Sequence, residues 1–288
     1  MLPRASRQRR PNPSARNSNQ SQDRPMSEPK IKLHYEGSLA FITLNQPKRR
    51  NPLGLEFSDA MLDILNEINR NRSVDCVILT GAGRVFCGGG DLAEIMSTGE
   101  TDQEKEFTLI RGYNKVISAI YHLDRPVIAA VNGPAVGGGT CVAMACDIAI
   151  AAPSARYDFL FGRIGLSSAD MGATYLLNRL VGPVRASHLM LSGASIDAEQ
   201  GLKLGVFSQI SASEDKLLDD ARALANKICE GSRRASTITK LSLRRAPSMD
   251  FDACLEYEAY LQSFAFRTEG HKSRLSKILE QLAAARQQ

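Results

Sequence analysis

The sequence of 288 residues contains no tryptophan, and only 6% of its residues are aromatic. It has no run of about eighteen apolar residues, which excludes a membrane-spanning helix and a membrane partner. Six cysteines form no Cys-x-x-Cys pair and four histidines lie far apart, so neither a disulfide framework nor a metal site is expected. Hydrophobic residues make up 43%, as in globular domains. We therefore expect a globular protein of the reducing cytoplasm.

Excess positive charge is confined to the N-terminus. The formal net charge is +5, and residues 1–25 alone carry six arginines against one aspartate, so the rest of the chain is neutral. This balance leaves no basic body surface for nucleic acid. The prolines, serines and asparagines of this segment predict a disordered basic leader over residues 1–27. Its arginine-rich, acid-poor composition leaves import into an organelle open.

Short apolar runs alternate with segments of helical period, which indicates an α/β fold with a mostly helical part after residue 198. The loop expected between the early helices is the polar stretch 97–106. Strands are predicted at 30–35, 38–44, 75–80, 85–87, 126–131 and 147–151, and helices at 55–70, 107–121, 140–145 and 174–180.

Two glycine triplets, residues 88–90 and 137–139, each follow an apolar strand and precede a helix. Glycine permits positive φ and lets a ligand approach the backbone, and a helix start offers free N–H donors. Neither segment has the spacing of a P-loop or of a dinucleotide fingerprint. If the two loops converge, their N–H groups can hold one carbonyl oxygen, as an oxyanion hole does.

Together, these segments resemble the crotonase, or enoyl-CoA hydratase/isomerase, family. The resemblance rests on residues 79–92, 125–147 and 178–182 and extends roughly from residue 28 to 275. It implies a crotonase-like ββα spiral with a helical C-terminal trimerisation region. The expected divisions are a spiral core at 28–205, carrying the CoA and acyl site, and a helical region at 206–288. The resemblance also implies a homotrimer, often paired into a hexamer.

By resemblance, the substrate is an acyl-CoA thioester, and the N–H groups of Gly90 and Gly138 stabilise its enolate. Coenzyme A enters as part of the substrate, and no other cofactor is implied. The residues expected to contact it are Lys48, Arg49, Arg84, Phe86 and Gly88. An ordinary solvated surface remains the alternative for the three cations.

The sequence departs from the family's hydratases at two positions. Those enzymes use two glutamates, and the matching residues here are Cys141 and Phe161. One nearby carboxylate, Asp170, matches an aspartate of family isomerases, although it could instead cap the helix at 171–180. Cys141 could be a nucleophile or a small buried apolar residue. Cys141, Phe161 and Ser168 are expected to line the acyl pocket.

These residues predict an enzyme that acts on an acyl-CoA thioester through an enolate, with double-bond isomerisation as the leading reaction. One carboxylate suits removal of a proton at one carbon and its return at another. Hydration, thioester hydrolysis and decarboxylation are alternatives within the family. The two absent glutamates leave a non-catalytic CoA-binding paralogue open.

Overall fold

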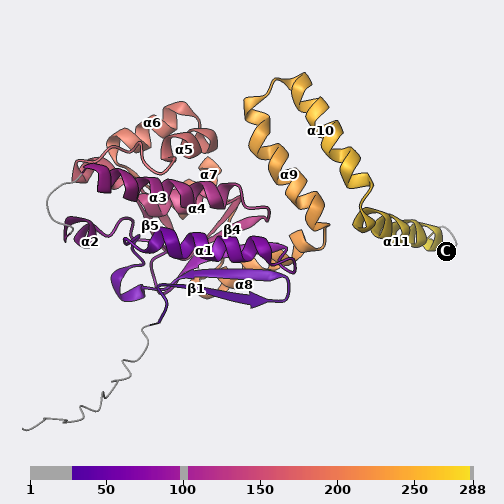
Figure 1. The fold of residues 1–288 in the computed structure, drawn as a ribbon, viewed down its shortest axis with the longest axis horizontal. Coiled ribbons are helices and arrows are strands. Elements are labelled where there is room, and N and C mark those ends of the chain that lie inside the picture. Colours follow the sequence, from indigo (N-terminus) through magenta and orange to yellow (C-terminus); the bar gives the residue numbers. More distant parts are fainter. Residues whose placement is uncertain (1–27, 98–102, 286–288) are drawn as a thin grey trace, which may run out of the picture.

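A computed structural model describes residues 28–97 and 103–285. The predicted leader at 1–27 lies outside these ranges. The chain forms a mixed body of strands and helices, from which three long C-terminal helices extend (Figure 1). The α/β class and the helical C-terminal region are thus confirmed. In the described ranges, no helix is both long and apolar enough to cross a membrane.

Six strands form the main sheet in the order β1-β2-β3-β4-β6-β9. The first two strands pair antiparallel as a hairpin, and every later neighbour is parallel. The bounds are β1 Ile31–Glu36, β2 Leu39–Leu44, β3 Cys76–Gly81, β4 Val127–Val131, β6 Ile148–Ala151 and β9 Gln209–Ile210. The structure contains the predicted strands at 30–35, 38–44, 75–80, 126–131 and 147–151 to within one residue at each end.

The inner strands β2, β3, β4 and β6 are buried on both faces, which explains their continuous apolar runs, whereas β1 is partly exposed. Alternate residues of β3 point to opposite sides, with Val77 and Leu79 in the larger core and Cys76 and Ile78 in the smaller. The larger core contains residues of α1 (Phe57–Arg70) and α3 (Gln103–Tyr121). The smaller core is closed by Leu217, Ala221 and Ala225 of α8 (Leu217–Cys229).

A three-stranded sheet, β5-β7-β8, lies beside the site described below. Its strands are β5 Pro134–Val136, β7 Arg156–Asp158 and β8 Ser195–Asp197. The remaining helices of the body are α2 Leu92–Ser97, α4 Gly138–Ala145, α5 Ala173–Val181, α6 Pro183–Ser192 and α7 Ala198–Leu204. Short 3-10 turns are η1 Pro47–Arg49, η2 Leu160–Ile164, η3 Glu214–Lys216 and η4 Ala246–Ser248.

Two predicted elements differ from the structure. Residues 85–87 form no strand, since only Cys87 makes an isolated bridge, to Ala135. Helix α3 starts at Gln103 rather than at 107, so part of the predicted 97–106 loop is helical. Glu104 and Glu106 in its first turn favour this earlier start because they complement the positive end of the helix dipole. Residues 98–102 of that loop lie outside the described ranges.

The C-terminal helices are α9 Arg233–Arg245, α10 Phe251–Phe266 and α11 Glu269–Ala285. A mostly buried charge cluster attaches α9 to the body. Lys240 Nζ donates to Asp147 Oδ2 at 2.7 Å and to the Arg125 carbonyl at 2.9 Å. Arg244 donates to Asp147 Oδ1 at 2.8 Å. One carboxylate at the edge of β6 therefore holds two cations of α9. The predicted boundary at residue 205 stays a prediction, and β9 and α8, which follow it, pack on the sheet.

We expect Asp147→Ala to lower the free energy of unfolding by about 3 kcal/mol, because it leaves the buried Lys240 without its counter-ion. Chemical denaturation of the variant measures this loss. The matched control is Asp219→Ala, which breaks ion pairs of a carboxylate that is 60% exposed and should cost no more than about 1 kcal/mol. Equal costs for the two variants would contradict the role given to Asp147.

Candidate active site

The two glycine segments meet in space. Val136 N–H donates to the Cys87 carbonyl at 2.9 Å, and Phe86 N–H donates to the Pro134 carbonyl at 3.1 Å. These bonds flank the bridge between Cys87 and Ala135. Backbone hydrogen bonds thus join the two turns immediately before their glycines, although the turns are about fifty residues apart in the sequence.

The close approach leaves no room for side chains at this junction. A Cβ on Gly89, whose φ is +84°, would lie 2.7 Å from the Val136 carbonyl oxygen. A Cβ on Gly139 would lie 2.6 Å from the Cys87 carbonyl oxygen. Because real Cβ atoms essentially never come so close to backbone, both positions require glycine.

Gly90 lies opposite Leu53 in a parallel bridge, but the hydrogen bonds of this bridge are made by the neighbours of Gly90 and not by its own N–H. Leu53 N–H donates to the Gly89 carbonyl at 2.8 Å, and Asp91 N–H donates to the Leu53 carbonyl at 3.1 Å. In such a parallel bridge, the N–H of the central residue points away from the partner strand. Accordingly, Gly90 N–H has no acceptor among the described residues.

Gly138 begins α4, so its N–H is one of the helix's unpaired donors. It too lacks an acceptor within the described part of the chain. The ideal Cβ position of Gly89 lies 3.8 Å from this nitrogen, which places the first loop against the second helix start. The structure therefore brings together the loops that carry both predicted donors and leaves both N–H groups unpaired.

Two asparagines fix the first loop. Asn51, only 2% exposed, donates to the carbonyls of Ala82 at 2.9 Å and Val85 at 2.7 Å. Asn132 accepts from Gly81 N–H at 3.0 Å and donates to the Gly83 carbonyl at 2.8 Å. These side chains satisfy a turn that cannot pair with a strand, which keeps the loop in one shape.

Asp170 lies in a turn beside the start of α4. Its carbonyl accepts a weak hydrogen bond from the Cys141 thiol at 3.8 Å. Burial raises the pKa of its carboxyl group, opposed in part by a hydrogen bond from the Met171 backbone. The alternative of a helix cap is wrong: α5 is capped by Gly172, without a side-chain hydrogen bond. The carboxylate is thus partly desolvated and is not used to cap the helix.

Met171, next to Asp170, has the positive φ of +46° that bulky residues rarely adopt. Its side chain is 3% exposed, and its Sδ lies 2.7 Å from an ideal Cβ position on Gly138. Leu53 Cδ1 lies 2.9 Å from the same position. An apolar floor of Met171 and Leu53 therefore covers Gly138 on this side.

Cys141 and Phe161 are both buried at the second loop. Burial raises the pKa of the Cys141 thiol to about 12, and the nearby Asp170 charge adds to the effect. The thiol therefore stays protonated at neutral pH and behaves as a small apolar residue rather than as a nucleophile. The ring of Phe161 lies 3.6 Å from an ideal Cβ position on Gly137. Neither residue offers a carboxylate at these positions.

Ser168 faces away from the glycine loops toward α6. Its hydroxyl donates to the Met190 carbonyl at 3.0 Å, and it lines a separate surface hollow with Met190, Leu191 and Pro183. This hydrogen bond gives the Ser168 hydroxyl a partner within the protein, so a ligand is not needed to satisfy it.

The basic turn lies against the first loop, since a Cβ on Gly83 would come within 3.0 Å of Pro47 Cβ. Lys48 and Arg84 are exposed. Arg49 is instead engaged by the buried Asp91 and, at 3.7 Å, by Glu94. Phe86 is buried in the core, and Gly88 N–H donates to the Arg50 carbonyl at 2.8 Å. Of the five predicted CoA contacts, two thus have structural partners of their own, and Phe86 belongs to the core.

Tyr113 of α3 was not a predicted site residue. Its hydroxyl donates to the Leu53 carbonyl at 2.8 Å, the same oxygen that accepts from Asp91 N–H. Burial raises the pKa of this phenol to about 12, with smaller contributions from the charges of Glu94 and Asp170. Tyr113 therefore braces the segment at Leu53, which forms the bridge to Gly90. A tyrosine on an apolar helix face gives no sequence signal of such a role.

Comparison with known proteins identifies relatives along nearly the whole chain. The family model for enoyl-CoA hydratase/isomerase matches residues 34–287. A short-chain-enoyl-CoA hydratase of Clostridium acetobutylicum is 34% identical over 86% of this chain and 94% of its own. The 1,2-epoxyphenylacetyl-CoA isomerase of Escherichia coli strain K12 is 33% identical over 86% of this chain and 95% of its own.

The fold is equally well matched. The crystal structure of an enoyl-CoA hydratase from Bacillus anthracis aligns with a TM-score of 0.83 at 29% identity, covering 88% of this chain and 97% of that one. This match confirms the predicted crotonase-like fold. With the family model and the relatives, it shows that the chain belongs to the enoyl-CoA hydratase/isomerase family.

Proposed function

We propose that this chain isomerises the double bond of an enoyl-CoA. The observation that carries the proposal is Asp170. Among the carboxylates of the described residues with a shifted pKa, it alone has a raised one, and it lies beside the second glycine loop without a capping role. A base whose pKa is raised toward neutrality is suited to take up and return a proton.

The proposed reaction needs one base and one oxyanion site. Gly90 and Gly138 N–H would hold the thioester oxygen of a 3-enoyl-CoA. Asp170 would take a proton from the α-carbon, and the resulting dienolate would carry its charge mainly on that oxygen. The protonated Asp170 would then return the proton to the γ-carbon. The double bond moves into conjugation, and no water is consumed.

Hydration is the second candidate, because relatives such as the Clostridium acetobutylicum enzyme are named hydratases. In this chain the positions of the two family glutamates hold Cys141 and Phe161, which are buried and uncharged. Water activation would therefore depend on Asp170 alone. This contrast favours proton transfer over water addition.

For the coenzyme, we propose Lys48 and Arg84 as contacts to its phosphates, since both are exposed cations at the mouth of the first loop. Arg49, paired with Asp91, would instead hold the turn. Charged contacts of this exposed kind contribute little each, so they would add affinity without deciding the reaction.

We expect Asp170→Asn to lower the isomerisation rate by about 10²–10⁴, the usual contribution of a positioned acid/base. The assay follows formation of the conjugated 2-enoyl-CoA from a 3-enoyl-CoA, with water addition measured in parallel. Cys141→Ala is the matched control, since its thiol carries no charge, and it should keep most of the activity. Full activity of Asp170→Asn would refute the proposal, and water addition as the main wild-type reaction would favour a hydratase.

The raised pKa of Asp170 also predicts a pH-dependent stability. Below the unfolded-state pKa the carboxyl is protonated in both states and contributes no difference. As the pH rises through the higher folded-state pKa, the folded protein must ionise a desolvated group, so stability is lost. Asp170→Asn should therefore raise the melting temperature at pH 7 and leave it unchanged at a pH below both values. A melting difference that is the same at both pH values would exclude this cause.

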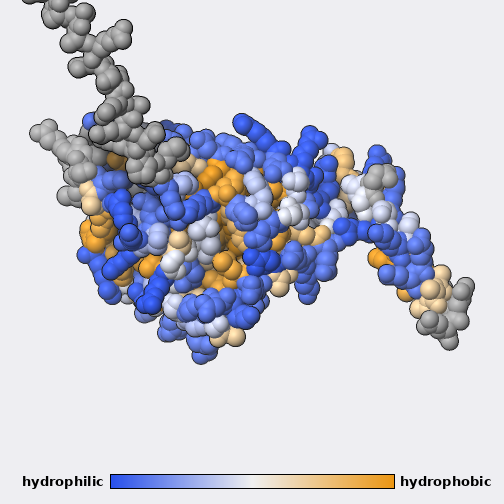
Figure 2. All heavy atoms as spheres, turned by 90° about the horizontal axis from the view of Figure 1, so that it is seen from below, coloured by the Kyte–Doolittle hydropathy of each residue, from blue (hydrophilic) through white to orange (hydrophobic). Residues whose placement is uncertain are grey.

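An assembled form is part of the proposal. Helix α10 has no buried residue, and many apolar side chains along α10 and α11 are about half exposed or more, including Phe251 at 76% and Tyr260 at 64%. Figure 2 shows apolar patches on the arm formed by α10 and α11 and in the middle of the face of the body next to this arm. Such surface is unusual on a monomer and is typical of obligate interfaces. We therefore propose a homotrimer or a pair of trimers.

We expect sedimentation of the wild type to give a trimer or hexamer at micromolar concentration. Tyr260→Glu, which puts a charge into the apolar face of α10, should dissociate it. A charge change at Lys227→Glu, on an exposed position of α8, should not. A wild-type protein that sediments as a monomer would contradict the assembly.

A further inference from the structure

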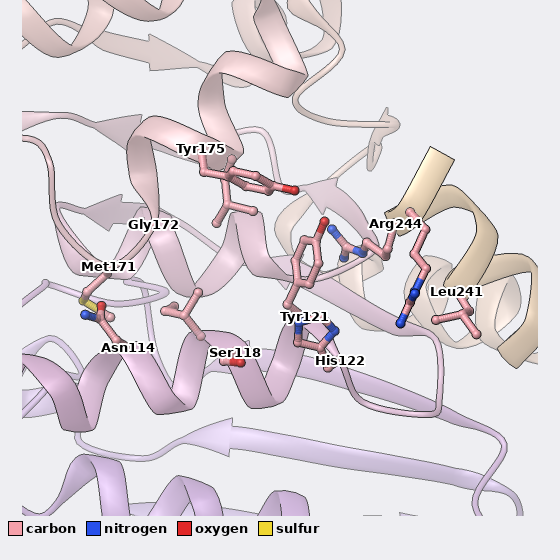
Figure 3. A pocket seen from close by; sticks show the side chains of 12 residues that line it. Asn114, Ser118, Tyr121, His122, Met171, Gly172, Tyr175, Leu241 and Arg244 are labelled. Atoms are coloured by element: carbon pink, nitrogen blue, oxygen red, sulfur yellow. The ribbon is translucent and has the colours of Figure 1, made fainter. Parts of the chain in front are cut away.

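A cavity of about 510 Å³ adjoins the candidate site at Met171 (Figure 3). This volume lies in the range of about 300–1,000 Å³ typical of small-molecule sites. Met171 contacts Gly138 on one side and lines the cavity on the other. The cavity therefore lies across Met171 from Gly138, next to the place where a thioester would be held.

One face of α3 forms the floor of this cavity. Asn114, Ile117, Ser118, Tyr121 and His122 line it at helical spacing. The helix rises about 1.5 Å per residue, so this face is about 12 Å long from Asn114 to His122. An extended chain advances about 1.2 Å per bond, judged from the 3.3–3.6 Å that three backbone bonds span. The length therefore suits a chain of about ten bonds.

The walls are apolar in the middle and cationic at the far end. Leu176 and Tyr175 of α5 face Tyr121, and the two tyrosine rings meet edge to face at 6.3 Å. At the end away from Met171 lie His122 and the α9 residues Leu241 and Arg244 (Figure 3). Arg245, the next residue of α9 after Arg244, also lines the cavity. The ring of Tyr121 is held by Arg244, whose guanidinium carbon lies 3.7 Å from its centroid. This packing keeps the far wall in a fixed shape.

The far end carries uncompensated positive charge. Asp147 faces two cations, Lys240 and Arg244, and so neutralises only one charge of that cluster. Arg245 is exposed and has no acidic partner in the part of the chain that the structure describes. The residues lining the cavity include no aspartate or glutamate. A carboxylate entering this end would meet a guanidinium with free donors, the geometry that binds carboxylates best.

We propose that this cavity is the distal acyl compartment, and that the substrate is a medium-length acyl-CoA whose acyl group ends in a second carboxylate. The inference rests on the proposed function, because it takes the thioester to be held at Gly138. The chain would pass Met171, lie along the apolar face of α3 and place its terminal carboxylate at Arg245. A methyl-terminated chain of the same length would fill the cavity but leave this cation unpaired.

The test compares trans-3-decenoyl-CoA with its counterpart in which the terminal methyl group is a carboxylate. We expect the wild type to prefer the carboxylated substrate by about fivefold in kcat/KM, the upper range for an ion pair with an exposed guanidinium. Arg245→Gln should reduce this ratio to near one. The matched control, Arg70→Gln, removes an exposed cation of α1 far from the cavity and should keep the ratio. Equal kcat/KM for the two substrates in the wild type would overturn the proposal.

A second pair of variants tests whether the chain runs along α3. Ser118→Phe fills the middle of the cavity, and Lys115→Phe places the same ring on an exposed position of α3 outside the lining. The first should lower the ratio of ten-carbon to four-carbon turnover by about tenfold, and the second should not. An unchanged ratio in Ser118→Phe would place the acyl chain elsewhere.

Binding separates this inference from the proposed reaction. The saturated ten-carbon acyl-CoA with a terminal carboxylate cannot be isomerised, and calorimetry measures its Kd directly. Tight binding that Arg245→Gln weakens about fivefold would support the compartment even if no enoyl-CoA is isomerised. Turnover of four-carbon enoyl-CoA without any effect of the carboxylate on binding would refute the compartment and leave the proposed reaction standing.

Discussion

The contact between the two glycine loops is the constraint on which the rest of the site depends. Backbone of one loop lies so close to backbone of the other that a Cβ on Gly89 or Gly139 would overlap a carbonyl oxygen. The bonds that make this contact are formed by Phe86 and Val136, one residue or more before the glycines. Gly90 and Gly138 are therefore left with N–H groups that have no backbone acceptor in the described ranges. A tight backbone junction and unpaired N–H groups are two consequences of one packing arrangement.

Around this junction the protein uses side chains to hold backbone in place. Asn51 and Asn132 satisfy the turn after β3, while Tyr113 and Asp91 share the carbonyl of Leu53. Each of these bonds is buried or partly buried, so losing one would leave a carbonyl or amide unpaired at a cost of about 1–3 kcal/mol. Rigid placement of the donors before a substrate arrives is the condition under which an oxyanion site accelerates a reaction.

Much of this arrangement could be predicted from the sequence. The strands, the two glycine turns and the partly desolvated Asp170 follow from local patterns and from the family resemblance. The contribution of Tyr113 could not be predicted, because it depends on where α3 crosses the segment at Leu53. The sequence of a helix face does not show which segment it packs against. The pairing of Arg49 with Asp91 was hidden for the same reason, since 42 residues separate them. Asp170 looked like a helix cap because the sequence placed the helix start at 171, whereas α5 begins at Ala173 and is capped by Gly172.

The chemistry of the site is shaped by what the second loop lacks. A hydratase needs one group to activate water and another to protonate carbon. The pKa of each group must lie near the pH at which the enzyme works. Here the two positions hold a thiol that burial keeps protonated and a phenyl ring packed on Gly137. In the proposed reaction, neither residue could activate water at these positions. A single carboxylate in such surroundings can move a proton between two carbons of one substrate, because the proton it removes is the proton it returns. In the proposed reaction, the desolvation that would disfavour water addition also raises the affinity of Asp170 for that proton, so the two features would act in one direction.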